Sequence, residues 1–391
     1  MHGAPGVSLP YLLLLACHDG GSADLESGAD VTYVTDSAAL NPPDTPSADL
    51  MFDADHELLV AALPVFVSVQ DDGDVAWSAS TADFVADTRC DDGRCRVEGV
   101  TPDGDGLLVN WALQNGVQSE GGVVRMDLAD GILAPTWEMT GWGYPHEALR
   151  DPTGPYFVIA DATLDAIHWV SDDGTGNPDA PVASIDDTTP GVGSAHTPNG
   201  LWIYRDGAEV FLLVSYRGND AGAPGSEVGR LLCFDVTDRG APSLLWAFPE
   251  EGNLRAPHNP SFHWRDDRWI LLFAHSHGVR SESGSIGVAQ TVDLRQVPTY
   301  IADLVPTNGA WGYPRGAELT GDDTLIITDT GTGGVFGAVY VAAFPTELLP
   351  EGGSGAYTND GAEQRWVTVD DTMLVGGLNE AYRSILWAPT Y

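Results

Sequence analysis

The stretch Ala256–Gly278, APHNPSFHWRDDRWILLFAHSHG, contains the pattern from which the fold can be predicted. It begins with a polar, proline-containing segment that includes His258 and Asn259, passes through an acidic turn and reaches an apolar run from Trp269 to Phe273. The apolar run predicts a short buried strand, because it is rich in aromatic and aliphatic residues and is bounded by polar ones. The meaning of a histidine and an asparagine ahead of such a strand depends on whether the arrangement recurs.

The arrangement does recur, about every 56 residues. WGYPHEAL from Trp142 is repeated as WGYPRGAEL from Trp311, and HTPNGLW from His196 belongs to the same series. The anchoring prolines are spaced by 53, 59 and 57 residues, at Pro145, Pro198, Pro257 and Pro314. Each anchor is followed by an apolar strand and then by two further strand-like segments. One unit is therefore four short strands joined by Asp-Gly and Gly-rich turns.

Four strands per unit of this length predict a blade of a β-propeller. Five units run from about Val97 to Asp371, within a predicted propeller domain of residues 55–391. The segments Glu57–Arg96 and Met373–Pro389 remain, and together they would form a sixth blade closed by both termini, which removes an open sheet edge. We therefore expect an all-β, six-bladed propeller of four-stranded blades. Seven blades, or five with a small N-terminal β-domain, also agree with the spacing.

The N-terminal segment predicts export. Residues 1–17 contain VSLPYLLLLAC, an apolar run too short to span a bilayer. It resembles the lipobox of bacterial lipoproteins, which implies lipidation of Cys17, although no Lys or Arg precedes it. An ordinary signal peptide is the alternative. Residues 18–54 are acidic and poor in large apolar groups, which predicts a disordered tether. The expected location is the bacterial cell envelope, with the lipid anchor as the sole membrane attachment.

Charge and cysteine content narrow the function classes. A net charge of −40, from 57 acidic and 17 basic residues, repels phosphate backbones and argues against nucleic-acid partners. We expect a monomer. Cys90 and Cys95 flank an Asp-Gly turn in CDDGRC, which predicts a hairpin disulfide in an exported protein. Cys233, in RLLCFDV, is predicted to be a buried thiol.

The polar beginnings of the repeats predict a site. In a propeller the first strand of each blade lines the axis, so these residues should converge at one end of a central channel. The series is Glu98, His146, His196 with Asn199, His258 with Asn259, and Arg315. Histidine can serve as a base or nucleophile near neutral pH, and arginine fits the oxygens of sulfate, phosphate or carboxylate. This set favours transfer of an anionic group, and no nucleotide- or cofactor-binding motif is present. A polar channel that merely holds water is the alternative.

The repeats resemble those of the arylsulfotransferase-like propellers. The likeness rests on PHNPSFHWRDDRWILLFAHSHG and YPRGAELTGDDTLIITDTGTGGVF, although the family's LPNGN turn is replaced by WRDDR, TGDDT and RDPTG. The resemblance implies sulfuryl transfer between phenolic compounds through a sulfated histidine. His258 would be the nucleophile, His146 and His196 acid/base or sulfuryl contacts, and Arg315 the anion clamp. The expected substrate contacts are Asn199, Asn259, Tyr144 and Tyr313.

A second resemblance competes with the first. RVEGVTPDGDGLLVNWA and HTPNGLWIYRDGAEVFLLVSY are similar to blade beginnings of the gluconolactonase/senescence-marker propellers. That family implies a lactone hydrolase that uses a divalent cation such as Ca²⁺, here held by Glu98 and Asn199. The third ligand position is occupied by Arg315, whose charge opposes a cation, and Asn259 would have to substitute. A non-enzymatic surface propeller that binds a ligand or a protein is the remaining alternative.

Overall fold

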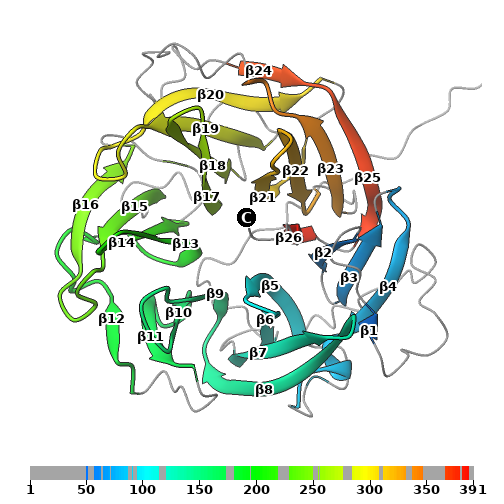
Figure 1. The fold of residues 1–391 in the computed structure, drawn as a ribbon, viewed down its shortest axis with the longest axis horizontal. Helices are drawn as coiled ribbons and strands as arrows, with labels where there is room; N and C mark the ends of the chain where they lie inside the picture. Colours follow the sequence, from blue (N-terminus) through cyan, green and yellow to red (C-terminus); the bar gives the residue numbers. More distant parts are fainter. Residues whose placement is uncertain are drawn as a thin grey trace, which may run out of the picture.

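Six small sheets form a ring around a central axis, with the first strand of each innermost (Figure 1). The computed structural model describes residues 50–51, 57–62, 65–70, 72–86, 90, 95–113, 120–172, 180–193, 195–218, 229–249, 254, 256–275, 284–307, 311–331, 337–346, 366–378 and 381–386. The predicted six-bladed, all-β propeller is confirmed. The predicted signal with Cys17, and the predicted tether as far as residue 49, lie outside these residues.

We number the blades around the ring, and each consists of four antiparallel strands. Blade 1 consists of β26 (Ala381–Leu386), β2 (Glu57–Ala62), β3 (Val65–Gln70) and β4 (Val75–Ser80). Blade 2 consists of β5 (Cys95–Asp103), β6 (Gly106–Leu113), β7 (Glu120–Ala129) and β8 (Ile132–Trp142). Blade 3 consists of β9 (Pro145–Arg150), β10 (Tyr156–Asp161), β11 (Ala166–Ser171) and β12 (Ala183–Ile185). Blade 4 consists of β13 (Pro198–Asp206), β14 (Glu209–Tyr216), β15 (Arg230–Asp235) and β16 (Ser243–Phe248). Blade 5 consists of β17 (Pro257–Arg265), β18 (Arg268–His275), β19 (Ser285–Thr291) and β20 (Thr299–Pro306). Blade 6 consists of β21 (Pro314–Leu319), β22 (Thr324–Asp329), β23 (Gly337–Ala343) and β25 (Asp371–Leu378).

Both termini close the ring, as the sequence predicted. In blade 1 the C-terminal strand β26 is innermost and pairs with β2 from the N-terminal part of the propeller. One detail differs from the expectation. The last of the five predicted units ends at Asp371, so its final segment, QRWVTVDD, is expected to supply the fourth strand of that unit. Its strand β24 (Trp366–Val369) instead pairs in parallel with β20 of blade 5. The outer strand of blade 6 is β25, which contains Met373, a residue expected in the closing blade.

The core lies between neighbouring blades. The second strand from the axis is buried along nearly its whole length in every blade, because it is covered on both faces. Between blades 3 and 4, for example, Val158 and Trp169 pack in one cluster with Leu201, Leu212 and Tyr216. Burial of such side chains contributes about 25 cal/mol per Å² of apolar area, so blade-to-blade packing fixes the ring.

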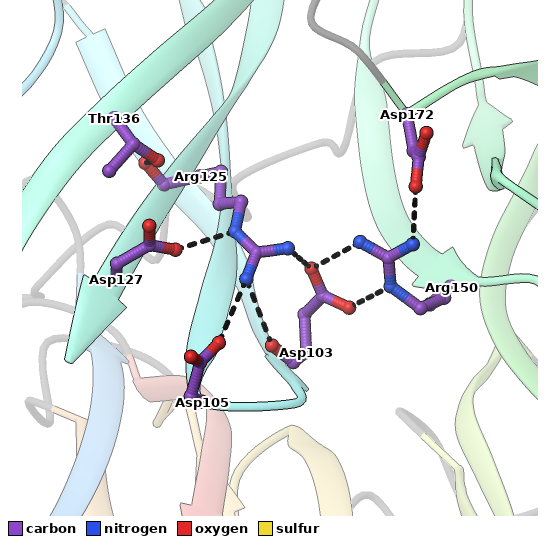
Figure 2. A network of polar contacts seen from close by, with 7 residues as sticks. All are labelled: Asp103, Asp105, Arg125, Asp127, Thr136, Arg150 and Asp172. Atoms are coloured by element: carbon purple, nitrogen blue, oxygen red, sulfur yellow. Dashed lines mark hydrogen bonds and ion pairs between the residues drawn. The ribbon is translucent and has the colours of Figure 1, made fainter.

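Buried charge also links blades 2 and 3, at the ends of their first strands (Figure 2). The side chain of Asp103, at the end of β5, is fully buried and pairs with Arg125 of its own blade. It also pairs with Arg150 of blade 3, whose Nη2 lies 3.0 Å from Asp103 Oδ2. Arg150 Nη1 reaches Asp172 at 2.6 Å, and Arg125 Nε reaches Asp127 at 2.6 Å. A buried carboxylate needs such partners, and here they come from two blades.

Three further features complete the fold. Cys90 and Cys95 are joined by a disulfide, and Cys233 is a buried free thiol. The short strand β1 (Leu50–Met51), within the predicted tether, pairs with β8 of blade 2. Within the part of the chain that the structure describes, no helix has the length and apolarity needed to cross a membrane.

Candidate functional site

The first strands of all six blades carry a local irregularity close to their beginning. There the pairing register with the second strand shifts, so that one or two residues have no partner opposite them. The skipped positions include Glu98, His146, Asn199, Asn259 and Arg315. A β-bulge re-aims the side chain that it carries. These residues all stand at the same end of the first strands, so the bulges bring them to one end of the axis.

Glycine lets the first strands approach one another at this end. Gly99 follows Glu98 in the chain, and a Cβ on it would lie 2.8 Å from the carbonyl oxygen of His146. Gly200 follows Asn199, and a Cβ there would lie 2.5 Å from the Cα of Asn259. A larger residue at either position would push neighbouring blades apart where the site residues meet.

Two equivalent aspartates hold the loops of the two Trp-Gly-Tyr-Pro copies. Asp161, the last residue of β10, accepts hydrogen bonds from the backbone N–H groups of Gly143 and Tyr144, at 2.7 and 3.0 Å. Asp329, the last residue of β22, accepts from Gly312 at 2.7 Å and from Tyr313 at 2.5 Å. Charged acceptors of backbone N–H groups form strong hydrogen bonds. They therefore fix Tyr144 and Tyr313 at the beginning of the first strands.

A chain of polar contacts runs across blades 3 to 6. The Nδ1 of His258 donates to Oδ1 of Asn199 at 2.8 Å, and Nδ2 of Asn199 lies 3.4 Å from Nε2 of His146. When His258 is neutral, a proton on Nδ1 leaves a lone pair on Nε2. Nη1 of Arg315 lies 2.8 Å from Nε2 and 3.4 Å from Nδ1 of His258. Two such short distances place the guanidinium over the imidazole ring rather than in line with that lone pair.

Tyr313 and a second arginine stand next to His258. The hydroxyl of Tyr313 lies 3.5 Å from Nε2 of His258 and accepts a hydrogen bond from Nη2 of Arg217 at 3.2 Å. The guanidinium of Arg315 also covers the Tyr313 ring, 4.1 Å from its centroid. Two guanidinium groups and one hydroxyl therefore surround the Nε2 side of His258. This arrangement suits the oxygens of an anion.

Tyr144 takes the corresponding position beside His146. Its ring meets the His146 ring edge to face, with centroids 4.5 Å apart. Burial, followed by the neighbouring Glu98 carboxylate, raises the pKa of Tyr144, and Arg96 acts in the opposite direction. Glu98 is 3 % exposed. A carboxylate and a guanidinium thus stand together near the Tyr144 hydroxyl.

Both axial histidines are neutral at physiological pH. Burial is the main cause that lowers the pKa of His146 well below its usual value, and Arg315, Arg217 and Arg96 lower it further. Burial also lowers the pKa of His258 well below its usual value, again with Arg315 and Arg217. Desolvation and nearby positive charge both disfavour the imidazolium form. The site therefore offers neutral imidazole in a cationic environment.

Two predicted site residues have other surroundings. His196 is partly exposed, and its Nδ1 pairs with the Asp165 carboxylate of blade 3, which also accepts the Thr197 N–H at 2.6 Å. Asn259 has a positive φ of 26° and packs against Gly316, where a Cβ would lie 3.5 Å from the Asn259 amide nitrogen. The catalytic role of His196 and the substrate contact of Asn259 stay predictions.

The surroundings do not fit a divalent cation at Glu98 and Asn199. The carbonyl oxygen of Asn199 accepts from His258, and the charged groups that act on the neighbouring histidines are arginines. A cation at this position would be repelled by those guanidinium groups. Among the residues that the structure describes, no group of three His, Cys, Asp or Glu side chains could hold a metal ion.

Sequence reasoning missed Arg217 and Arg96. Arg217 directly follows the second strand of blade 4, in VSYRGN. Because that strand is antiparallel to the first, its end lies at the same end of the axis as the first strand's beginning. A search that included residues just after each second strand would have found it. Arg96 lies two residues before Glu98 on β5, and both side chains act on the Tyr144 hydroxyl.

No protein-family model matches the chain, and no curated protein matches it. Solved structures match the chain at low sequence identity. A putative 6-phosphogluconolactonase from Bacteroides uniformis has 14% identity and a TM-score of 0.47, over 74% of this chain and 78% of that one. One from Bacteroides fragilis has 13% identity and a TM-score of 0.47, over 88% and 99%. A periplasmic gluconolactonase from Pseudomonas aeruginosa has 14% identity and a TM-score of 0.46, over 84% and 99%.

Proposed function

We propose that the axial site acts on small esters that carry an anionic group, with sulfuryl transfer between phenolic compounds as the leading reaction. One observation carries the proposal. His258 is neutral, its Nε2 lone pair is set by the contact of Nδ1 with Asn199, and Arg315 lies 2.8 Å from Nε2. A neutral imidazole beside an arginine combines a nucleophile with a clamp for the anion that it attacks.

In the proposed reaction, the sulfate group of an aryl sulfate lies against Arg315 and Arg217. The Nε2 of His258 attacks sulfur, a nitrogen–sulfur bond forms, and the bond from sulfur to the aryl oxygen breaks. The phenolate leaves and takes up a proton from solvent. A second phenol then attacks the same sulfur, the nitrogen–sulfur bond breaks, and the proton of that phenol returns to solvent, which restores neutral His258 and gives the new aryl sulfate. The guanidinium groups stabilise the charge on the sulfuryl oxygens throughout.

Lactone or acyl-ester hydrolysis is the second candidate, because the same groups would suffice for it. His258 would remove a proton from water as water attacks the carbonyl carbon, and Arg315 would stabilise the developing oxyanion. One observation favours it: Arg315 already covers the ring of Tyr313, which leaves less of that ring available to stack on a phenol. The charges around Asn199 favour a form of this reaction without a cation.

The test is turnover by the full chain with an aryl sulfate donor and a phenol acceptor, alongside a panel of sugar lactones. Replacement of His258 by Ala should lower turnover at least about 100-fold, because it removes the reacting nitrogen. His263→Ala is the matched control. His263 lies on the same strand and contacts Ser261 at 2.9 Å, so its loss should leave the rate within about twofold.

Each outcome has a distinct meaning. Turnover of aryl sulfates that depends on His258 supports sulfuryl transfer, and turnover restricted to lactones supports the second candidate. Sulfate binding without turnover of either class would overturn the enzyme proposal and favour a propeller that binds a ligand.

A further inference from the structure

Aromatic side chains gather between blades 4 and 5, at the end of the first strands that is opposite to the axial site. Trp202 and Tyr204 belong to β13, and Trp264 and Trp269 belong to β17 and β18. The strands β13 and β17 are neighbours in the ring (Figure 1). The ring centroid of Trp269 lies 4.9 Å from that of Tyr204, 5.1 Å from that of Trp264 and 5.8 Å from that of Trp202. We call these four residues the aromatic cluster.

Two rings of the aromatic cluster are exposed to solvent. Tyr204 is 37% exposed and Trp264 is 49% exposed, whereas Phe262, which packs against Trp202, is only 5% exposed. Both exposed rings meet Trp269 at an interplanar angle of 67°, in edge-to-face contacts. Large aromatic rings that are exposed together in one place mark a binding surface, because scattered exposure is the usual case.

The arginines next to these rings in the sequence do not share their face of the sheets. Arg205, Arg265 and Arg268 alternate with the rings along regularly paired parts of β13, β17 and β18, so they lie on the opposite faces. Nε of Arg265 reaches Asp323 of blade 6 at 3.2 Å, away from blade 4. Arg268 donates to Oε1 of Gln290 at 3.2 Å.

Carboxylates border the aromatic cluster instead. Asp266 and Asp267 form the two-residue turn between β17 and β18, and both are exposed. Both have a positive φ, of 47° and 60°, as a tight hairpin turn of this kind requires. Asp206, also exposed, follows Tyr204 by two residues in the regularly paired part of β13 and therefore lies on the same face. Three carboxylates thus stand close to the exposed rings.

An arginine of blade 5 also reaches the gap between the two blades. Arg295 covers the ring of Phe211, 5.3 Å from its centroid, but it pairs with both Glu209 and Asp293. Its positive charge is therefore matched by two carboxylates. The charge around the aromatic cluster stays negative.

We propose that the aromatic cluster binds a small organic cation with an alkylated ammonium group, of the quaternary ammonium class. The faces of tryptophan and tyrosine rings carry partial negative charge and attract such a cation. The three aspartates add a direct attraction, and the net charge of −40 raises the concentration of cations near the surface. An anionic partner would be repelled by the same charges. This site lies apart from the axial site and does not depend on the reaction proposed there.

The first measurement compares two ligands of the same shape. The full chain, labelled with ¹⁵N-tryptophan, is titrated with choline and with 3,3-dimethylbutanol, in which carbon replaces the charged nitrogen. Choline should move the indole signals of Trp264 and Trp269, which are assigned with Trp264→Phe and Trp269→Phe. It should bind at least about fivefold tighter than the neutral alcohol. Equal binding of the two ligands, or no binding of choline, would overturn the proposal.

Replacement of an exposed ring tests the place of binding. Trp264→Ala should weaken choline binding at least about fivefold, because it removes one aromatic face, and Trp264→Phe should keep most of the affinity. Trp366→Ala is the matched control, because Trp366 is 38% exposed but lies on β24 at the outer edge of blade 5. Its affinity should stay within about twofold of the wild type. Equal losses in Trp264→Ala and Trp366→Ala would show that choline does not bind at the aromatic cluster.

Removal of the carboxylates tests the charge. The double variant Asp266→Asn/Asp267→Asn should weaken choline binding about threefold and leave the neutral alcohol unchanged. An equal effect on both ligands would contradict the electrostatic part of the proposal.

Vesicles of phosphatidylcholine distinguish the two sources of a quaternary ammonium group. Vesicle binding that Trp264→Ala removes would identify the ligand as a lipid headgroup. Binding of free choline alone would identify a soluble cation. Binding to vesicles that persists in Trp264→Ala, without binding of free choline, would count against the site.

Discussion

At the scale of single residues, the site is defined by what surrounds His258. Asn199 sets which ring nitrogen carries the proton, and burial, together with the positive charges of Arg315 and Arg217, keeps the ring neutral. The same two arginines are the groups that would hold an anion. Besides burial, neutrality of the base therefore has the same electrostatic origin as affinity for the substrate.

This origin predicts an unusual pH dependence. Because the pKa of His258 is well below 6.5, turnover should persist at pH values where an ordinary histidine is protonated. Arg217→Gln removes one of the charges that lower the pKa, so the acid limb of kcat/KM should move up toward pH 6.5. An acid limb at the same pH in the variant and the wild type would contradict this account.

The same pKa shift has a consequence for stability. As pH falls below about 6.5, the unfolded chain binds protons at His146 and His258 that the folded protein does not bind. The contribution of these two histidines to the free energy of unfolding therefore decreases with decreasing pH, down to their folded-state pKa values. Urea unfolding of wild type and His258→Gln between pH 7 and 5 would show it as a shallower dependence in the variant.

At the scale of elements, the loops before β9 and β21 position the tyrosines and are held by Asp161 and Asp329. Each carboxylate accepts several backbone N–H groups that would otherwise be buried without a partner. The aspartate at the end of each second strand therefore fixes the loop that places a tyrosine before the first strand of the same blade.

Asp329→Asn and Asp161→Asn separate the two loops. Each should lower the free energy of unfolding by about 1–3 kcal/mol, because the amide replaces a charged acceptor with a single neutral one. Asp329→Asn should also weaken sulfate binding by loosening Tyr313, and Asp161→Asn should not. Urea unfolding and calorimetric titration with sulfate would measure both effects. Equal losses of sulfate affinity in the two variants would count against the placement of the anion beside Tyr313.

At the scale of the whole molecule, the ring is held by apolar packing between blades, by closure of blade 1 through β26 and by buried charge between blades 2 and 3. The charge network lies at the ends of β5 and β9 (Figure 2), whereas the site lies at their beginnings. Stability and candidate function therefore use opposite ends of the same strands.

Asp103→Ala tests this network. The variant leaves Arg125 and Arg150 without their shared buried carboxylate, so the free energy of unfolding should fall by about 3–5 kcal/mol. Asp127→Ala is the matched control: it also pairs with Arg125, but its side chain is 42% exposed, and its loss should cost less than about 1 kcal/mol. Similar losses in both variants, measured by urea unfolding, would show that Asp103 does not join the blades.

The amino-acid sequence was sufficient to predict the repeat, the six blades, the closure by both termini and the end of the axis at which polar residues gather. These features follow from the spacing of prolines and apolar strands along the chain. That spacing is kept even where the residues of the repeats differ. The sequence was not sufficient to predict that β24 pairs with blade 5 and that β25 completes blade 6. Both segments are short and strand-like, so the strand with which each one pairs is determined by packing in the folded chain.

Which polar residues meet is evident only in the folded chain. Folding brings His146, Asn199, His258 and Arg315 into one chain of contacts, whereas His196, from the same sequence series, pairs with Asp165. Folding also brings Arg217, which directly follows the second strand of blade 4, to this cluster. A contact at the axis depends on the bulge in each first strand and on the approach of neighbouring blades at Gly99 and Gly200. Neither is encoded in the periodicity that reveals the fold, because that periodicity records spacing along the chain and not the direction of each side chain.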